Sequence, residues 1–394
     1  MAKVIDIIGK VLSGEWGTDD ETGDGIPVLR TTNFTNEGVV NYNDVVTRMI
    51  TKKNIEEKYL RKGDIIIEKS GGSDKFPVGR VIYFDGEDNT YLFNNFTGLL
   101  RVKDREIWYP RYVFYSLFAN YKRGGTRAFE NKTTGIHNLK IDDYVSRYEV
   151  AEIGLTEQVL ICDKLDKLYE IIKLREQELQ LLDELIKARF VEMFGDPISN
   201  PLGWKKRVLR EVCTKLNDGT HFSPESFETG EYKYITAKNI KMSGFDFSNI
   251  TYVSEEVHRP IYERCNPEYG DVLYIKDGVT TGIAMVNTLE EEFTLLSSVA
   301  LLKQDRRIMN GYFLTALLNN ESMYTDIRNN MGGAAITRLT IAKLNAIKVI
   351  LPPLDLQNQF ADFVHQVDKL KLQVQKSLDE TQTLFDSLMQ QYFG

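Results

Sequence analysis

The stretch LTEQVLICDKLDKLYEIIKLREQELQLLDELIKARFVEMF, residues 155–194, contains neither glycine nor proline. Its apolar residues recur at alternating spacings of three and four, and this heptad-like pattern predicts a long helix packed against another helix. The residues of this stripe are Leu165, Leu168, Ile172, Leu179, Leu182, Ile186 and Met193. Ile171, Leu174, Leu181 and Leu185 widen the stripe, so that the helix could contact more than one neighbour.

A second stretch, residues 356–393, has similar apolar spacing after the break LPPLDLQ at 351–357. The two prolines of that break stop any helix before it, and Gly195 ends the first helix. At 1.5 Å per residue, a helix of nearly 40 residues is about 55 Å long. We expect the two helices to pair and to hold two globular domains apart; two unrelated surface helices are the alternative.

The segments that precede the two helices repeat each other in the same order, at an offset of about 200 residues. The matching pairs are VLRTTNF (28–34) with YITAKNI (234–240), GDIIIEKSGG (63–72) with GDVLYIKDG (270–278), YVFYSL (112–117) with YFLTAL (312–317), and TGIHNLKI (134–141) with AAITRLTI (334–341). Short strands after Gly-Asp turns and one apolar helix in each copy predict the α+β class.

The repeat divides the chain into four segments. Residues 1–150 and 197–350 are predicted to form two similar mixed α/β domains. Residues 151–196 and 351–394 are predicted to form the two long helices that separate them.

Length and composition bound the class of protein. A chain of 394 residues with 42% hydrophobic and 27% charged residues is expected to fold into two or three globular domains. No apolar run approaches the roughly 18 to 20 residues of a membrane span, and no signal-peptide pattern is present at residues 1–17, so we expect a cytoplasmic protein without membrane contact. Three scattered cysteines and four scattered histidines indicate neither a disulfide framework nor a metal site.

Motifs for catalysis are missing from the sequence. There is no GxGxxG turn for S-adenosylmethionine and no GxxxxGK[ST] phosphate loop. The tetrapeptide at 266–269, Asn-Pro-Glu-Tyr, resembles the NPPY motif of amino-methyltransferases, but a carboxylate replaces the second proline, and we interpret it as a turn at a strand end. We therefore predict no catalytic residue.

Two equivalent segments are suited to binding DNA. Residues 121–139 and 328–339 each place basic and amide side chains beside a glycine pair. Arg and Lys contact phosphates or guanine, Asn pairs with adenine, and glycine permits close approach of the backbone. Solvated loops are the alternative. The predicted DNA-binding residues are Lys69, Ser70, Lys75, Arg80, Arg123, Thr126, Arg127, Asn131 and Lys132 in the first domain, and Thr220, His221, Lys238, Lys276, Asp277, Thr280, Arg328, Asn329 and Arg338 in the second. His221 could instead brace its own loop. A net charge of -8 argues against indiscriminate DNA coating but not against a locally basic face.

Taken over its whole length, the chain resembles the specificity (S) subunit of type I restriction-modification systems. LNDGTHFSP at 216–224 is similar to the DGTHxTP opening of that family, and LPPLDLQNQF at 351–360 to its LPPLxEQ motif. The paired Gly-Asp segments and ARFVEMFGDP at 188–197 also match. In the first half, GEWGTDD at 14–20 and AEIGLTEQ at 151–158 stand at the places of the two motifs.

The resemblance implies two target-recognition domains, each reading one half of a split double-stranded DNA sequence. It implies that the long helices form an antiparallel coiled coil that seats two methyltransferase (M) subunits, with restriction (R) subunits as a further class of partner. It also implies a non-catalytic chain without a cofactor of its own: S-adenosylmethionine, and ATP and Mg for restriction, are expected on the partner subunits.

Antiparallel helices would set the distance between half-sites on the duplex. We predict that inserting one heptad in either helix changes the spacer between the half-sites and leaves their sequences unchanged. A coiled-coil adaptor that binds protein through the repeated domains is the main alternative. A self-contained DNA methyltransferase is a second, and the missing cofactor loop argues against it.

Overall fold

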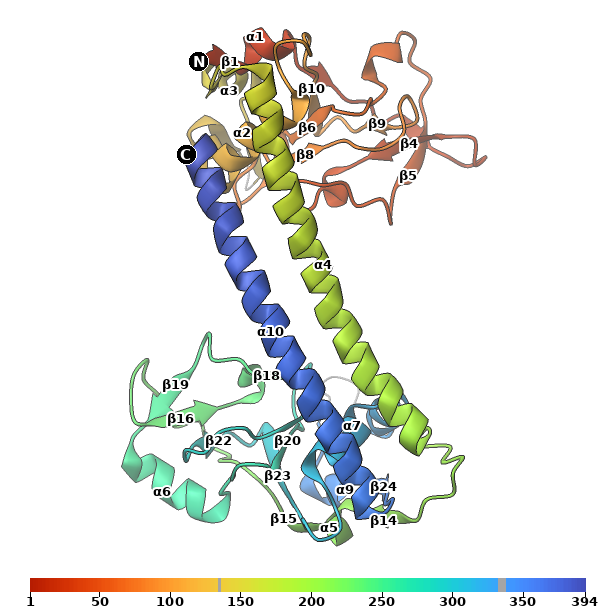
Figure 1. The fold of residues 1–394 in the computed structure, drawn as a ribbon, viewed down its shortest axis with the longest axis vertical. Helices are drawn as coiled ribbons and strands as arrows, with labels where there is room; N and C mark the ends of the chain where they lie inside the picture. The colour runs from red at the N-terminus through yellow and green to blue at the C-terminus, as the bar shows by residue number, and fades with distance from the viewer. Residues whose placement is uncertain (134–135, 332–337) are drawn as a thin grey trace. The chain divides into compact units, whose positions relative to one another are not determined.

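The computed structural model describes residues 1–133, 136–331 and 338–394 (Figure 1). The chain divides into two compact units. The first comprises Met1–Arg175 and Ser377–Gly394, and the second comprises Glu176–Lys376. Each unit contains one copy of the repeat together with parts of both long helices.

The first unit opens with a short strand and a short helix and is built mainly of short strands. Its elements are β1 (Ala2–Lys3), α1 (Val4–Ile8), β2 (Leu12–Ser13), β3 (Thr18–Asp19), β4 (Ile26–Leu29), η1 (Thr31–Asn33), β5 (Val46–Met49), η2 (Glu56–Lys58), β6 (Ile65–Glu68), β7 (Ser70–Gly72), β8 (Val81–Tyr83), β9 (Leu92–Phe93), β10 (Thr97–Leu100), α2 (Pro110–Lys122), η3 (Gly125–Phe129), β11 (Glu130–Thr133), β12 (Ile136–Leu139), α3 (Ile141–Arg147) and β13 (Glu149–Val150).

The second unit follows the same plan. Its elements are β14 (Lys206–Val208), α5 (Leu209–Val212), β15 (Cys213–Asp218), β16 (Tyr232–Ile235), η4 (Ala237–Asn239), β17 (Ile240–Lys241), β18 (Gly244–Phe245), β19 (Thr251–Val253), α6 (Glu255–Arg264), β20 (Val272–Ile275), β21 (Ala284–Val286), β22 (Thr294–Leu295), β23 (Val299–Gln304), α7 (Gly311–Asn319), α8 (Glu321–Asn329), α9 (Ile341–Asn345) and β24 (Lys348–Ile350).

Equivalent sheets occur in the two units. The central antiparallel sheet has the order β2-β10-β6-β8 in the first unit and β15-β23-β20-β21 in the second. A second sheet in each unit has a strand with one antiparallel and one parallel neighbour. In the first unit β4 pairs antiparallel with β5 and parallel with β9, and in the second β16 pairs antiparallel with β19 and parallel with β22. Helices α2 and α7 occupy the predicted apolar segments. The predicted duplication of a mixed α/β domain is confirmed.

The central strands β6 and β20 explain why the Gly-Asp turns recur. All four residues of each strand are buried, as expected for a strand covered on both faces. Gly63 and Gly270 precede these strands with φ of 95° and 85°, a conformation that glycine adopts without strain. The buried carboxylates of Asp64 and Asp271 then accept hydrogen bonds from the backbone N–H of the third residue before them, at 2.8 and 2.9 Å.

The long helices are α4 (Leu155–Phe194) and α10 (Leu354–Phe393), close to the predicted ranges. In the first unit, Leu165 of α4 and Phe393 of α10 belong to one apolar core. In the second unit, the ring of Phe360 lies 5.6 Å from that of Phe190, and Lys371 Nζ lies 2.6 Å from Asp183. A later residue of α10 therefore meets an earlier residue of α4, so the helix segments pair in antiparallel order, as expected.

Each long helix is anchored at its start by a buried glutamine. Gln158 accepts a hydrogen bond from the N–H of Tyr109 and donates to the carbonyls of residues 107 and 153, at 2.8 to 2.9 Å. Gln357 accepts from the N–H of Asn310 and donates to the carbonyls of residues 308 and 352, at 2.8 to 3.0 Å. The start of the first helix therefore keeps the local geometry of the second, although AEIGLTEQ replaces the proline-containing motif.

Among the residues that the structure describes, no helix combines the length and the apolar composition that a bilayer span requires.

Candidate nucleic-acid interface

A lysine follows the central strand of each domain: Lys69 after β6 and Lys276 after β20. Each central sheet begins with a strand, β2 or β15, that contributes a residue near this lysine at the same register. This residue is Ser13 in the first domain and Asp218 in the second. Lys69 Nζ donates to Ser13 Oγ at 2.7 Å, and Lys276 Nζ lies 3.4 Å from Asp218 Oδ2. Burial, with a contribution from nearby Lys58, lowers the pKa of Lys69.

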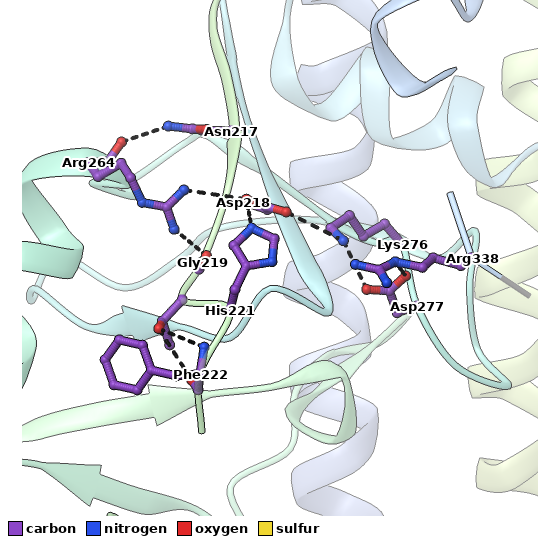
Figure 2. Close-up of polar contacts among 10 residues, drawn as sticks. Asn217, Asp218, Gly219, His221, Phe222, Arg264, Lys276, Asp277 and Arg338 are labelled. Carbon is purple, nitrogen blue, oxygen red and sulfur yellow. Dashed lines mark hydrogen bonds and ion pairs between the residues drawn. The ribbon is translucent and has the colours of Figure 1, made fainter. Parts of the chain in front are cut away.

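In the second domain this lysine is the centre of a charged network (Figure 2). The Lys276 side chain is only 2% exposed and also donates to Asp277 Oδ2, at 2.8 Å. The other oxygen of Asp218 lies 3.2 Å from His221 Nε2 and 3.5 Å from Arg264 Nη1. Because buried charges need partners, these contacts hold the buried side chains of Lys276 and Asp218 in place.

In each domain the lysine and the residue after it pair with a segment that comes later in the chain. The N–H of Leu139 donates to the carbonyl of Lys69, and the N–H of Leu339 donates to the carbonyl of Lys276, both at 2.8 Å. One position further, Ser70 pairs with Asn138 in the first domain, and Asp277 pairs with Arg338 in the second. Asn138 and Arg338 therefore occupy equivalent places. Arg338 Nε lies 3.3 Å from Asp277 Oδ1.

An arginine in each domain binds the loop that follows the central strand. Arg127 donates to the carbonyls of Asp74 and Lys75, both at 3.3 Å. Arg328 donates to the carbonyls of Thr281, at 2.8 Å, and Val279, at 3.4 Å. Both arginines thus order a loop through its carbonyl groups.

The remaining predicted residues differ in accessibility. The exposed ones are Lys75, Arg123, Asn131, Lys238, Thr280 and Asn329. Thr126 and Thr220 are buried, and Arg80 donates to the carbonyls of Thr31 and Phe34 and faces Glu68 at 3.6 Å. These three side chains brace the domain interior in this conformation. The side chain of Lys132 and the glycine pair at 332–333 lie outside the described residues.

Four members of these clusters were not among the residues predicted from the sequence: Ser13, Asn138, Asp218 and Arg264. Asp218 and Asn138 lie within the matched segments LNDGTHFSP and TGIHNLKI, which was the available signal. Ser13 and Arg264 are brought to the clusters by strand pairing and by the end of α6, and no motif marks them. In the described ranges, no group of three or more His, Cys, Asp or Glu side chains is arranged to hold a metal ion.

Comparison with known proteins agrees with this architecture. The family model described as "Type I restriction modification DNA specificity domain" matches residues 4–184 and again residues 201–381. No curated protein gives a significant match to the sequence.

Two solved structures share the fold over the full chain. One is the S subunit of a type I restriction-modification system from M. genitalium, with a TM-score of 0.58, 17% identity, and coverage of 100% of this chain and 95% of that one. The other, described as the structural basis of complex assembly and conformational transition of the type I R-M system, has a TM-score of 0.55 and 17% identity, covering 100% and 96%. The chain therefore belongs to the type I restriction-modification DNA specificity family and carries two specificity domains in tandem.

Proposed function

We propose that this chain recognises a bipartite double-stranded DNA sequence as the specificity subunit of a type I restriction-modification enzyme, with each domain reading one half-site. The observation that carries the proposal is that both specificity domains contain the same arrangement of residues after the central strand. In each domain a strand-end lysine is followed by a residue that pairs with Asn138 or Arg338, and then by a loop whose carbonyls accept from an arginine. Base readout requires polar side chains held at fixed positions, and this arrangement supplies them.

Exposed cationic and amide side chains in each domain are suited to contact the phosphate backbone of DNA. Arg123 and Lys75 are exposed in the first domain, and Lys238 and Asn329 in the second. Because the whole chain carries a net charge of -8, affinity for DNA must come from such local groups. We expect binding to weaken steeply with salt, by about one logarithmic unit per phosphate contact for each tenfold rise in salt.

The long helices are the proposed seat of two methyltransferase subunits. Several apolar side chains of α4 stay exposed, with fractions of 41% for Ile171, 64% for Leu174, 63% for Leu181 and 46% for Leu185. Clustered exposed apolar side chains mark sites of protein association. In this proposal the chain is non-catalytic and acts in the cytoplasm. The partner subunits bind S-adenosylmethionine, and restriction subunits would add ATP and Mg.

In this proposal the length of the two long helices sets the distance between the DNA half-sites. Each helix has 40 residues and is about 60 Å long at 1.5 Å per residue. B-DNA repeats about every 34 Å, so half-sites read on one face of the duplex would be separated by a turn or more.

Selection of bound duplexes tests the proposal. The chain, co-purified with its methyltransferase partner, is incubated with randomised duplex DNA at several salt concentrations, and the bound fraction is sequenced. We expect two short conserved blocks separated by a fixed unconserved spacer, with retention that falls as salt rises. Retention without any conserved block would contradict sequence-specific recognition, and no retention at low salt would support a protein-binding adaptor. Methyl transfer by the purified chain alone would contradict the non-catalytic assignment.

A further inference from the structure

We propose that Arg338 reads a guanine in the second half-site and that Asp277 is the positioning residue that orients it. The inference rests on the proposed function, because it assigns one base contact within the proposed DNA interface. It goes further by separating the residue that meets the base from the residues that hold it.

The geometry of Arg338 leaves its outer edge available. Its Nε lies in an ion pair 3.3 Å from Asp277 Oδ1, and the guanidinium donates no side-chain hydrogen bond within the described part of the chain. The side chain is 58% exposed, while that of Asp277 is 22% exposed. The two terminal N–H groups of an arginine lie side by side, and they match the O6 and N7 acceptors of guanine.

A chain of ion pairs fixes Asp277 from within the domain. Its second oxygen accepts from buried Lys276 at 2.8 Å, and Lys276 in turn faces buried Asp218 at 3.4 Å. Figure 2 shows this series running from Asp218 through Lys276 and Asp277 to Arg338. Because the interior members are immobilised in the free protein, the guanidinium loses less conformational freedom on binding.

The nearby carboxylate favours a base over a phosphate as the partner. A phosphate at the free edge of Arg338 would approach the negative charge of Asp277, whereas the guanine edge is neutral and offers only acceptors. Surface cations without a carboxylate partner are better suited to the backbone.

The first domain lacks this series of charges. At the places of Asp218, Asp277 and Arg338 it has Ser13, Ser70 and Asn138. The only charge among its equivalent residues is that of Lys69, which donates to a hydroxyl group. The inferred guanine contact is therefore confined to the second half-site.

Sequencing of methylated sites in cells that carry the chain and its partner tests the inference. Arg338→Gln is expected to relax one guanine position of the second half-site by about 5- to 150-fold in discrimination, the range for one bidentate base contact, with the first half-site unchanged. Arg338→Lys keeps the charge and can still donate to guanine O6 and N7, so it is expected to relax the same position less than Arg338→Gln does. Asp277→Asn is expected to relax that position less strongly, because it loosens the orientation of Arg338 without removing it.

Arg307→Gln is the matched control. Arg307 is also paired with an aspartate, Asp305. It follows the C-terminal end of β23, whereas the network lies near the N-terminal end of that strand, so the variant removes one positive charge away from the network. We expect the control to leave the motif intact. An unchanged motif in Arg338→Gln, or equal loss of methylation at all sites in that variant, would overturn the inference in favour of a phosphate contact. A wild-type complex that yields no bipartite motif would instead refute the proposed function.

Discussion

Replacing Gln158 or Gln357 by methionine tests whether the two long helices start in the same way. Each glutamine side chain is at most 1% exposed and makes three hydrogen bonds to backbone groups. Methionine has a similar volume but no hydrogen-bonding group of comparable strength, so one N–H and two carbonyls lose their partner. At about 1 kcal/mol for each bond, we expect each variant to lose about 3 kcal/mol in its free energy of unfolding.

Urea denaturation followed by circular dichroism measures this loss, and Gln382→Met provides the control. Gln382 lies exposed on α10, and among the described residues its side chain bonds only to that of Asp386, so its replacement is expected to change stability by less than about 0.5 kcal/mol. A loss below about 1 kcal/mol in both core variants would refute the anchoring role. A large loss in one and none in the other would refute the equivalence of the two helix starts.

Removing the strand-end lysines should have unequal effects on unfolding in urea. Lys276→Met leaves two carboxylates without their lysine partner and is expected to cost about 3 kcal/mol, whereas Lys69→Met leaves a neutral hydroxyl and is expected to cost about 1 kcal/mol; the reverse order would contradict the charged network. Burial lowers the pKa of His258, which faces Thr294 Oγ1 at 2.8 Å, so its proton binds more weakly in the folded state than in the unfolded state. Stability is therefore expected to fall as pH drops below about 6.5, and to fall less in His258→Gln; equal pH dependence of the two proteins in thermal melts would argue against this.

The architecture was accessible from the sequence because it depends on local patterns. The absence of glycine and proline from residues 155–194, together with spacings of three and four, predicted α4 almost to the residue. The Gly-Asp turns before β6 and β20 predicted the central strands because the turn requires a positive φ at glycine. The repeated order of matching segments then predicted two copies of one domain.

The roles within the candidate site were less accessible, because they depend on long-range pairing. Lys276 was among the residues predicted to contact DNA, yet it is buried between Asp277 and Asp218, a residue 58 positions earlier in the chain. Strand register brings these groups together, and register is not visible in a single sequence. Thr126 lies in a basic, glycine-containing segment, but its side chain packs against Gly79, where a Cβ would come within 2.8 Å of it.

The most direct test of the account is a map of modified adenines in cells that carry the chain with its methyltransferase partner, compared with a variant that has one extra heptad in both α4 and α10. Seven residues lengthen a helix by about 10 Å, which corresponds to about 3 base pairs. We predict a bipartite motif whose spacer grows by about that amount while both half-sites keep their sequence. A continuous motif, or altered half-sites at the original spacing, would contradict the account.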